Sequence, residues 1–268
     1  MIRYGKIPPP ANVRLANETK TMYYYSDALR QPSPTQVMWR YMDLCRLASL
    51  ISTKQLYFCN VTRFEDPHEA IIPANTFAEI KDTQADEAAG LLLPSYKGMR
   101  KSLGTLFGHL RKGMFANCWH MSEHQSVAMW KLYLPNEKEG VAVKSTFHRI
   151  TESLRQTTQP ICGGIVSYVD FDNDSLEMGN YLKIVVTKRC SFEHENEFRL
   201  VYQDVKANYS ELMPGVLIPV DIGTLLESVY VSPKSDHGFL ERVEMLCRDN
   251  AIAADVIRST LYDPPPAD

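Results

Sequence analysis

The stretch VMWRYMDLCRLASLISTKQLYFCNV, residues 37–61, predicts a strand, a helix and a second strand in direct succession. Residues 37–41 combine aromatic and aliphatic side chains, which is typical of a strand. Asp43 is suited to cap the following helix, in which apolar residues recur at helical spacing. Residues 56–61 return as a strand. This unit begins the regular part of the chain, because the residues before it are irregular and rich in proline.

The remainder of the chain mixes strands and helices without a steady alternation. Strands are expected at the start of 115–133 and at 141–147, 163–171, 192–202, 215–222, 226–233 and 255–263. Helices are expected over most of 73–113, at 180–189 and 237–251, and at the end of 115–133, where Ser122 is placed to cap. No glycine-rich turn follows a first strand, which argues against a doubly wound nucleotide-binding fold. The order predicts an α+β fold built on one or two mixed, mostly antiparallel sheets with flanking helices.

Length and proline distribution predict one principal domain. The 268 residues are enough to bury a substantial core, and the 44% hydrophobic and 23% charged content is ordinary for a soluble globular protein. We expect an N-terminal arm over 1–36, a single α+β domain over 37–262 with a helical insertion at about 73–113, and a tail over 263–268.

Charge and cysteine usage narrow the possible partners. The formal net charge of -3 provides no global basic field for nucleic acid, although a local basic groove stays open. None of the six cysteines forms a C-x-x-C pair, and core roles are expected for Cys45, Cys59 and Cys118. The N-terminus has no apolar core of signal-peptide length, and no apolar run is long enough to span a membrane. We therefore expect a cytoplasmic protein with reduced thiols and no membrane partner.

Charged residues alternate along FEHENEFRLVY, residues 192–202. Read as a strand, this stretch places four charged side chains on one face: Glu193, Glu195, Glu197 and Arg199. Three carboxylates in a row repel one another. The stretch is therefore either an exposed acidic face or one wall of a carboxylate-lined catalytic cleft. Arg199 is expected to neutralise Glu197 or Glu69 as a buried pair.

The loop FEDPHE, residues 64–69, offers several polar groups. Asp66, His68 and Glu69 could together bind a metal. A capping role for Asp66 is favoured, because such loops more often begin a helix, and Glu69 is expected to pair with Arg40 or Arg199. The H-E-x-x-H order of zinc hydrolases is absent from the chain, which argues against that class.

Three elements on different predicted strands resemble the arginine–serine–glutamate signature of ADP-ribosyltransferases. They are Arg40 on the first strand, Ser145-Thr146 on a middle strand and Glu195-x-Glu197 on a late strand. The resemblance implies a split sheet and NAD as substrate. It implies that Glu197, Glu195 and Arg40 are catalytic. The cofactor-binding residues that it implies are Arg40, Tyr41, Ser145, Thr146 and Tyr133, and it implies no metal ligand.

The residue types suit that chemistry. Cleavage of the nicotinamide–ribose bond creates oxocarbenium character at the ribose carbon, and Glu197 would stabilise this positive charge. Glu195 would orient the acceptor or accept its proton. Arg40 would clamp the anionic diphosphate in bidentate fashion. Ser145 would hold Glu197 and the nicotinamide side, and Tyr133 could stack on the nicotinamide.

A second resemblance covers roughly residues 37–260. Four motifs resemble a bacterial family of uncharacterised proteins, which has a tyrosine–arginine start where this chain has WRY at 39–41. The other three are FEDPHE at 64–69, Met129-Trp130 on a helix and a late E-x-E-x-R at 195–199. This resemblance implies no activity.

Three functions stay open on the sequence. The first is an NAD-dependent ADP-ribosyltransferase-like effector, a toxin or phage-defence protein, that modifies nucleic acid or protein. The second is a non-enzymatic binding module on the same scaffold. The third is a metal-dependent nuclease or hydrolase that uses the acidic residues 66, 69, 195 and 197. NAD should stabilise the first and a divalent metal the third, because a ligand of the folded state raises its stability.

Overall fold

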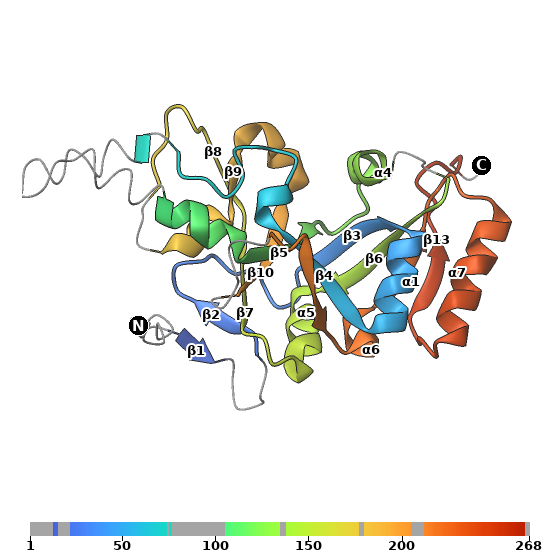
Figure 1. Ribbon diagram of the computed structural model, residues 1–268. Helices are drawn as coiled ribbons and strands as arrows, with labels where there is room; N and C mark the ends of the chain where they lie inside the picture. Colours follow the sequence, from blue (N-terminus) through green and yellow to red (C-terminus); the bar gives the residue numbers. More distant parts are fainter. Residues whose placement is uncertain are drawn as a thin grey trace, which may run out of the picture.

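The computed structural model of this chain describes residues 13–15, 22–73, 75–76, 105–134, 138–176, 180–204 and 212–265. Strands and short helices are mixed along the chain (Figure 1). The predicted α+β class, with a mixed and mostly antiparallel sheet and flanking helices, is confirmed. Within the described ranges, no helix is both long and apolar enough to cross a membrane.

The main sheet has nine strands within the described part of the chain. Its principal path is β11 (Gly215–Pro219), β4 (Gln55–Asn60), β5 (Met114–Met121), β3 (Val37–Asp43), β6 (Gly140–Thr146), β12 (Ser228–Val231) and β13 (Asp255–Arg258). Off this path, β10 (Glu197–Gln203) pairs with β5 and with β7 (Ile161–Ile165). Two small sheets join β1 (Val13–Leu15) to β2 (Tyr24–Ser26) and β8 (Ser167–Val169) to β9 (Thr187–Arg189). Only β12–β13 and β8–β9 are parallel among these strand pairs.

Helices cover both faces of the main sheet. They include α1 (Leu44–Thr53), α4 (Val127–Tyr133), α5 (Phe147–Ser153), α6 (Ile222–Leu225) and α7 (His237–Asp249). The 3₁₀ helices are η1 (Val61–Arg63), η2 (Leu154–Gln156), η3 (Tyr181–Ile184) and η4 (Cys190–Glu195) among the described residues. Buried side chains of α1, α5, α6 and α7 join one core, whereas α4 packs on the opposite face (Figure 1). Of the predicted helical insertion, 105–112 is helical, and 77–104 lies outside the described residues.

Three apolar clusters hold these layers. The largest lies under α1, α5, α6 and α7 and contains Trp119, Phe198 and Tyr23, which are each at most 1% exposed. A second cluster forms where residues 180–186 and the loop after β4 cover β5, β7 and β10. The third lies under α4 and includes Trp39, Tyr41 and Trp130. Trp119 and Trp130 therefore belong to the core.

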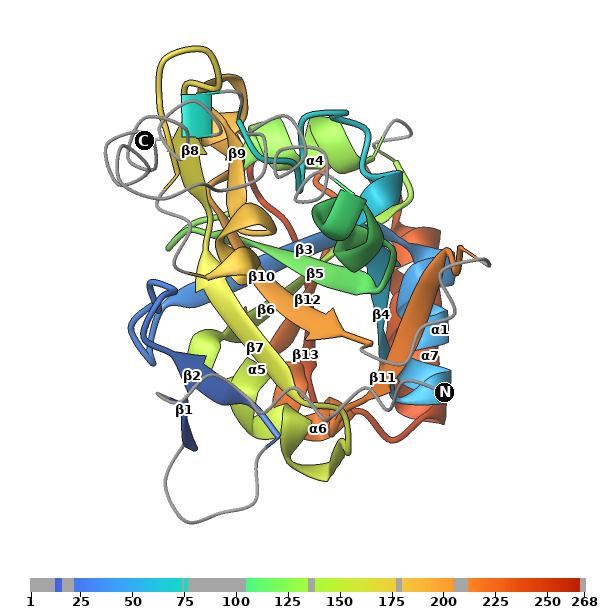
Figure 2. The same ribbon diagram turned by 60° about the vertical axis from the view of Figure 1, so that its left-hand side comes forward.

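The sheet splits at β5. One edge of β5 pairs with β10 along its whole length. The other edge pairs with β4 only at residues 115–116 and with β3 only at 120–121 (Figure 2). Between these ends, β3 and β4 part. Two side-chain bonds replace the missing ladder: Arg40 Nη1 donates to Cys118 O at 2.6 Å, and Asn117 Nδ2 donates to Tyr57 O at 2.9 Å.

The strand–helix–strand unit predicted at 37–61 folds as predicted. β3 leads into α1, Asp43 accepts from Arg46 N as the helix cap, and β4 follows. The cap predicted for α4 is wrong. Ser126 caps this helix by accepting from Met129 N, whereas Ser122 accepts from His124 N in a turn that ends the strand. The serine nearer the helix takes the capping role because the chain needs the intervening residues to leave β5.

Three other local predictions are corrected. Residues 180–189, predicted as a helix, form η3 and then β9, because Thr187, Lys188 and Arg189 pair with β8. Residues 163–171 are divided between β7 and β8. Residues 192–196, predicted as part of a strand, lie in η4 and its cap, so that β10 begins only at Glu197.

The cysteine environments differ from one another. Cys45 is exposed, so its predicted core role is wrong, because its position on α1 faces away from the sheet. Cys59 and Cys118 are half-buried on the sheet face that carries α4.

Candidate active site

The pairing of β10 with β5 decides which side chains meet. Glu197 lies opposite His120 and Arg199 lies opposite Cys118. Directly opposite residues of antiparallel strands share a face. Glu197 and Arg199 therefore lie on the face that carries α4, whereas Phe198 belongs to the largest apolar core. The predicted alternation is confirmed from Glu197 onward.

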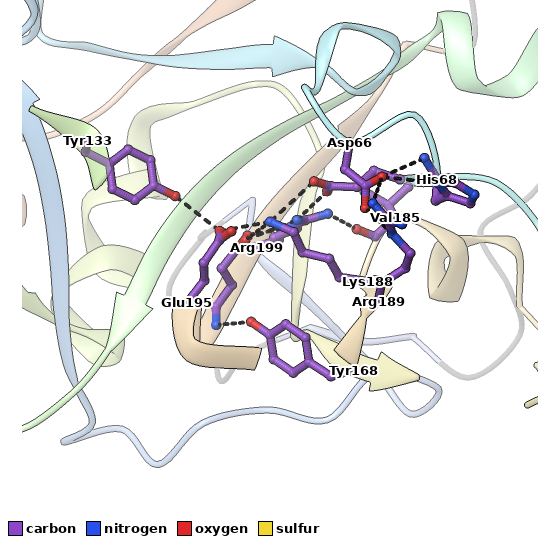
Figure 3. A network of polar contacts seen from close by, with 11 residues as sticks. Asp66, His68, Tyr133, Tyr168, Val185, Lys188, Arg189, Glu195 and Arg199 are labelled. Carbon is purple, nitrogen blue, oxygen red and sulfur yellow. Dashed lines mark hydrogen bonds and ion pairs between the residues drawn. The ribbon is translucent and has the colours of Figure 1, made fainter. Parts of the chain in front are cut away.

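Lys188 of β9 is the centre of a buried ionic cluster (Figure 3). Its Nζ lies 2.8 Å from Glu195 Oε2, 2.9 Å from Glu197 Oε1 and 3.3 Å from Glu69 Oε1. Lys188 and the three glutamates are each 6% exposed or less. The ammonium therefore occupies the point on which three carboxylates converge.

Arg199 completes the cluster from the strand itself. Its Nε lies 2.7 Å from Glu197 Oε2, and its Nη2 lies 2.5 Å from Glu69 Oε2. Its Nη1 donates to Val185 O at 2.9 Å, and the Phe64 ring covers the guanidinium at 5.0 Å. The prediction that Arg199 pairs with Glu197 or Glu69 is confirmed, and Arg199 contacts both.

Two tyrosines flank the glutamates (Figure 3). The Tyr133 hydroxyl, from α4, donates to Glu195 Oε2 at 3.3 Å, and Tyr133 is 39% exposed. The Tyr168 hydroxyl, from β8, accepts from Glu197 N at 2.9 Å. Tyr133 therefore connects Glu195 to the molecular surface.

The loop at 64–69 supplies Glu69 to this cluster and binds β9 next to it. Asp66 accepts from His68 N and forms a bidentate pair with Arg189 at 2.9 and 3.0 Å. Asp66 caps no helix, because its carboxylate folds back on its own turn and is held by Arg189. The loop thus presents Asp66 and Glu69 to consecutive residues of β9.

Glu195, the last residue of η4, and Glu197, the first residue of β10, have opposite protonation behaviour. Burial, a hydrogen bond with Glu197 and the charge of Glu197 raise the pKa of Glu195 to about 7, although Lys188 opposes this. Burial also acts to raise the pKa of Glu197, but Arg199 and Lys188 outweigh it and hold that pKa well below its usual range. Close carboxyls that divide their protons in this way are typical of acid–base sites.

The cations of the cluster stay charged. Burial disfavours the charged form of Lys188, but Glu197 and Glu69 outweigh burial and raise its pKa. Each carboxylate of the cluster thus contacts at least one protein cation, Lys188 or Arg199, and Asp66 is bound to Arg189. A divalent metal would have to displace Lys188, so the arrangement does not favour the metal-dependent hydrolase.

Arg40 lies in the split of the sheet rather than in the cluster. The described part of the chain gives Arg40 one polar contact, its hydrogen bond to Cys118 O. Burial, the largest influence, lowers the Arg40 pKa, while Cys118 and Tyr133 raise it. The polar contact that is described for Arg40 thus holds the split of the sheet and is not made to Glu195, Glu197 or Lys188.

The structure does not bring Ser145, Thr146 or Tyr41 to Glu197. Ser145 lies opposite Met38, which lies opposite Met121, so Ser145 is on the other face of the sheet from Glu197. Its hydroxyl donates to Leu225 O at 2.6 Å.

Thr146 and Tyr41 also have structural partners. Thr146 caps α5 by accepting from Arg149 N. The Tyr41 hydroxyl accepts from Ser126 N at 2.9 Å, and its ring packs edge-on against Trp130 at 5.0 Å. Burial raises the pKa of Tyr41 to about 12. Both side chains therefore stabilise helix starts.

Sequence reasoning missed Lys188 and Tyr168. Lys188 stands in the stretch predicted as a helix, and Tyr168 stands in a stretch predicted as one uninterrupted strand. The available signal was charge balance. If the four carboxylates at 66, 69, 195 and 197 are buried, they need more cations than Arg199 alone. Lys188 and Arg189 are the basic pair that precedes Glu195 and Glu197 in the sequence.

Three complexes of DarT from Thermus sp. 2.9 are among the solved structures to which this chain is similar. No protein-family model matches the chain, and no curated protein matches it. DarT of Thermus sp. 2.9 in complex with ADP-ribosylated ssDNA is 10% identical with a TM-score of 0.39, covering 86% of this chain and 96% of that chain. Its complex with NAD+ has 8% identity, a TM-score of 0.39 and coverage of 85% and 96%. Its complex with carba-NAD+ has 10% identity and a TM-score of 0.37, and the match covers 85% of this chain and 97% of that chain. The function proposed for this chain therefore rests on its own residues.

Proposed function

We propose that this chain is an NAD-dependent ADP-ribosyltransferase that modifies a macromolecular acceptor, nucleic acid or protein. One observation carries the proposal. Glu195 and Glu197 share the Lys188 ammonium, at 2.8 and 2.9 Å, with Glu197 ionised and Glu195 able to exchange a proton near pH 7. A transferase of this kind needs one permanent anion and one proton acceptor side by side.

The roles follow from the bond changes. The bond between ribose C1′ and the nicotinamide ring nitrogen breaks, its electron pair leaves with nicotinamide, and C1′ becomes electron-poor. Glu197 stabilises that positive charge. The acceptor nucleophile then bonds to C1′, and its proton passes to Glu195. Arg40 holds the diphosphate with its remaining N–H groups, and Tyr133 lines the approach to Glu195.

The test measures nicotinamide released from NAD by the purified protein and by three variants. Glu197→Gln should lose two orders of magnitude or more, about the effect of removing one electrostatic stabiliser. Glu195→Gln should lose the pH dependence near neutrality. Glu193→Gln is the matched control, because Glu193 is exposed on the same turn. NAD should also raise the melting temperature of the wild-type protein.

A second candidate is favoured by the same burial. Every carboxylate of the cluster has a cationic partner and is 6% exposed or less, which suits a purely structural ionic core in a binding module. Absence of nicotinamide release, together with no thermal shift by NAD, would overturn the transferase proposal and favour this candidate.

A further inference from the structure

Asn196, between the two glutamates, has a backbone conformation that few side chains adopt. Its φ of 38° and ψ of 62° are left-handed. This residue ends η4, and β10 begins at the next. In a continuous strand, carboxylates two residues apart would be spaced about 7 Å along one face. With the left-handed turn between them, both reach the same Lys188 ammonium.

Asn196 also bonds twice to the end of β5. Met121 N donates to Asn196 O at 2.9 Å, as the β10–β5 register requires. The reciprocal backbone donor is not available, because Asn196 N donates to Glu193 O at 3.1 Å within the turn. The side-chain Nδ2 takes its place and donates to Met121 O at 2.5 Å. The amide thus extends the ladder one residue beyond the strand.

From this geometry we propose that Asn196 is a positioning residue, whose left-handed turn and side-chain amide together hold Glu195 and Glu197 on Lys188. Asparagine combines tolerance of this backbone with an amide donor. Glycine offers the backbone freedom without the donor, and alanine offers neither. The role concerns how the two glutamates are held, so it stands whether or not the chain uses NAD.

The test is a titration of the glutamate side-chain carboxyls by ¹³C NMR, with Glu195 assigned from the resonance lost in Glu195→Gln. The charged or titratable groups that bear on Glu195 are Lys188 of β9, Glu197 and Arg199 of β10, Glu69 of the loop at 64–69, Tyr133 of α4, Tyr168 of β8 and His120 of β5. All of them are retained in Asn196→Gly, Asn196→Ala and the control Asn250→Gly. The control removes a hydrogen bond of the same kind, which the side-chain amide of Asn250 donates from Nδ2 to Leu246 O at 2.9 Å at the end of α7.

In the wild type, Glu195 should titrate near its pKa of about 7. Asn196→Gly should lower that midpoint by about half a pH unit or more, because Glu195 moves away from Glu197 and gains solvent, and Asn196→Ala should lower it further. Asn250→Gly should leave it in place. A folded Asn196→Gly protein whose Glu195 midpoint equals that of the wild type would overturn the proposal, even if its melting temperature falls. Loss of stability without a shifted midpoint is what a merely structural role produces.

Absence of NAD turnover in the wild type would defeat the proposed function and leave this result unaffected. If Asn196→Ala does not fold, the glycine variant alone decides, since it keeps the left-handed backbone accessible.

Discussion

Lys188 and Glu197 form an ion pair of 2.9 Å in which the two side chains are only 6% and 4% exposed. Removing two such charges from water costs several kcal/mol for each, so the pair persists because Glu69, Glu195 and Arg199 add further contacts. A network of this kind is costly to break and responds to pH, and both properties can be measured.

Replacement of Lys188 by methionine should destabilise the protein by about 3–5 kcal/mol, because it leaves buried carboxylates without their shared cation. Urea denaturation of Lys188→Met against the wild type measures the loss. The matched control is Lys131→Met, because Lys131 is exposed on α4. A loss below about 1 kcal/mol, the scale of a surface ion pair, would contradict the cluster.

Glu195 should make the protein less stable as pH rises toward 7. Its folded pKa of about 7 exceeds the ordinary 4.5, so the folded state holds the proton more tightly, and that stabilisation is lost as pH rises from about 4.5 through about 7. The loss has an upper bound of about 3–4 kcal/mol, since each pH unit between the two pKa values is worth about 1.4 kcal/mol. Glu197, whose pKa is held low, acts with the opposite sign and loses its contribution as pH falls below about 4.5. The measurement is the free energy of unfolding of the wild type and of Glu195→Gln between pH 5 and 8. The two curves should have different slopes, because only the wild type loses the Glu195 contribution as pH rises. Parallel curves would show that Glu195 has no raised pKa.

Arg40 should affect both stability and NAD binding. Arg40→Met removes the donor to Cys118 O in the sheet split and should cost about 1–3 kcal/mol. Arg40→Lys keeps the charge but not the planar fork, so it should retain more stability while raising the KM for NAD. Denaturation and NAD kinetics of both variants make the measurement. Unchanged stability in Arg40→Met would remove Arg40 from the split.

Trp130 should be required for the fold rather than for activity alone. It is 2% exposed on the buried side of α4, and truncation of a buried aromatic to alanine costs about 3–5 kcal/mol. Leu132→Ala on the same helix is the control, because Leu132 is 51% exposed and should change little. The two melting temperatures decide, and equal values would place Trp130 outside the core.

Local sequence patterns predicted much of the fold because short-range physics determines those elements. The cap at Asp43 and the helical spacing after it produced α1, and the alternation from Glu197 to Tyr202 placed Phe198 in the core. Repulsion among the glutamates also predicted that Arg199 would be buried against them, which it is.

What only the tertiary structure decided is which strands lie side by side. Lys188 was predicted on a helix, because the local sequence of 180–189 does not reveal that Lys188 pairs with Tyr168 of β8. Ser145 and Glu197 are separated by β3 and β5 and face opposite sides of the sheet, although the sequence orders them as a signature would. By itself the sequence determined the residue types, the periodicity and the need for cations. Strand order and register depend on contacts between residues far apart in the chain, and these placed Lys188, Tyr168 and Glu69 around the two glutamates.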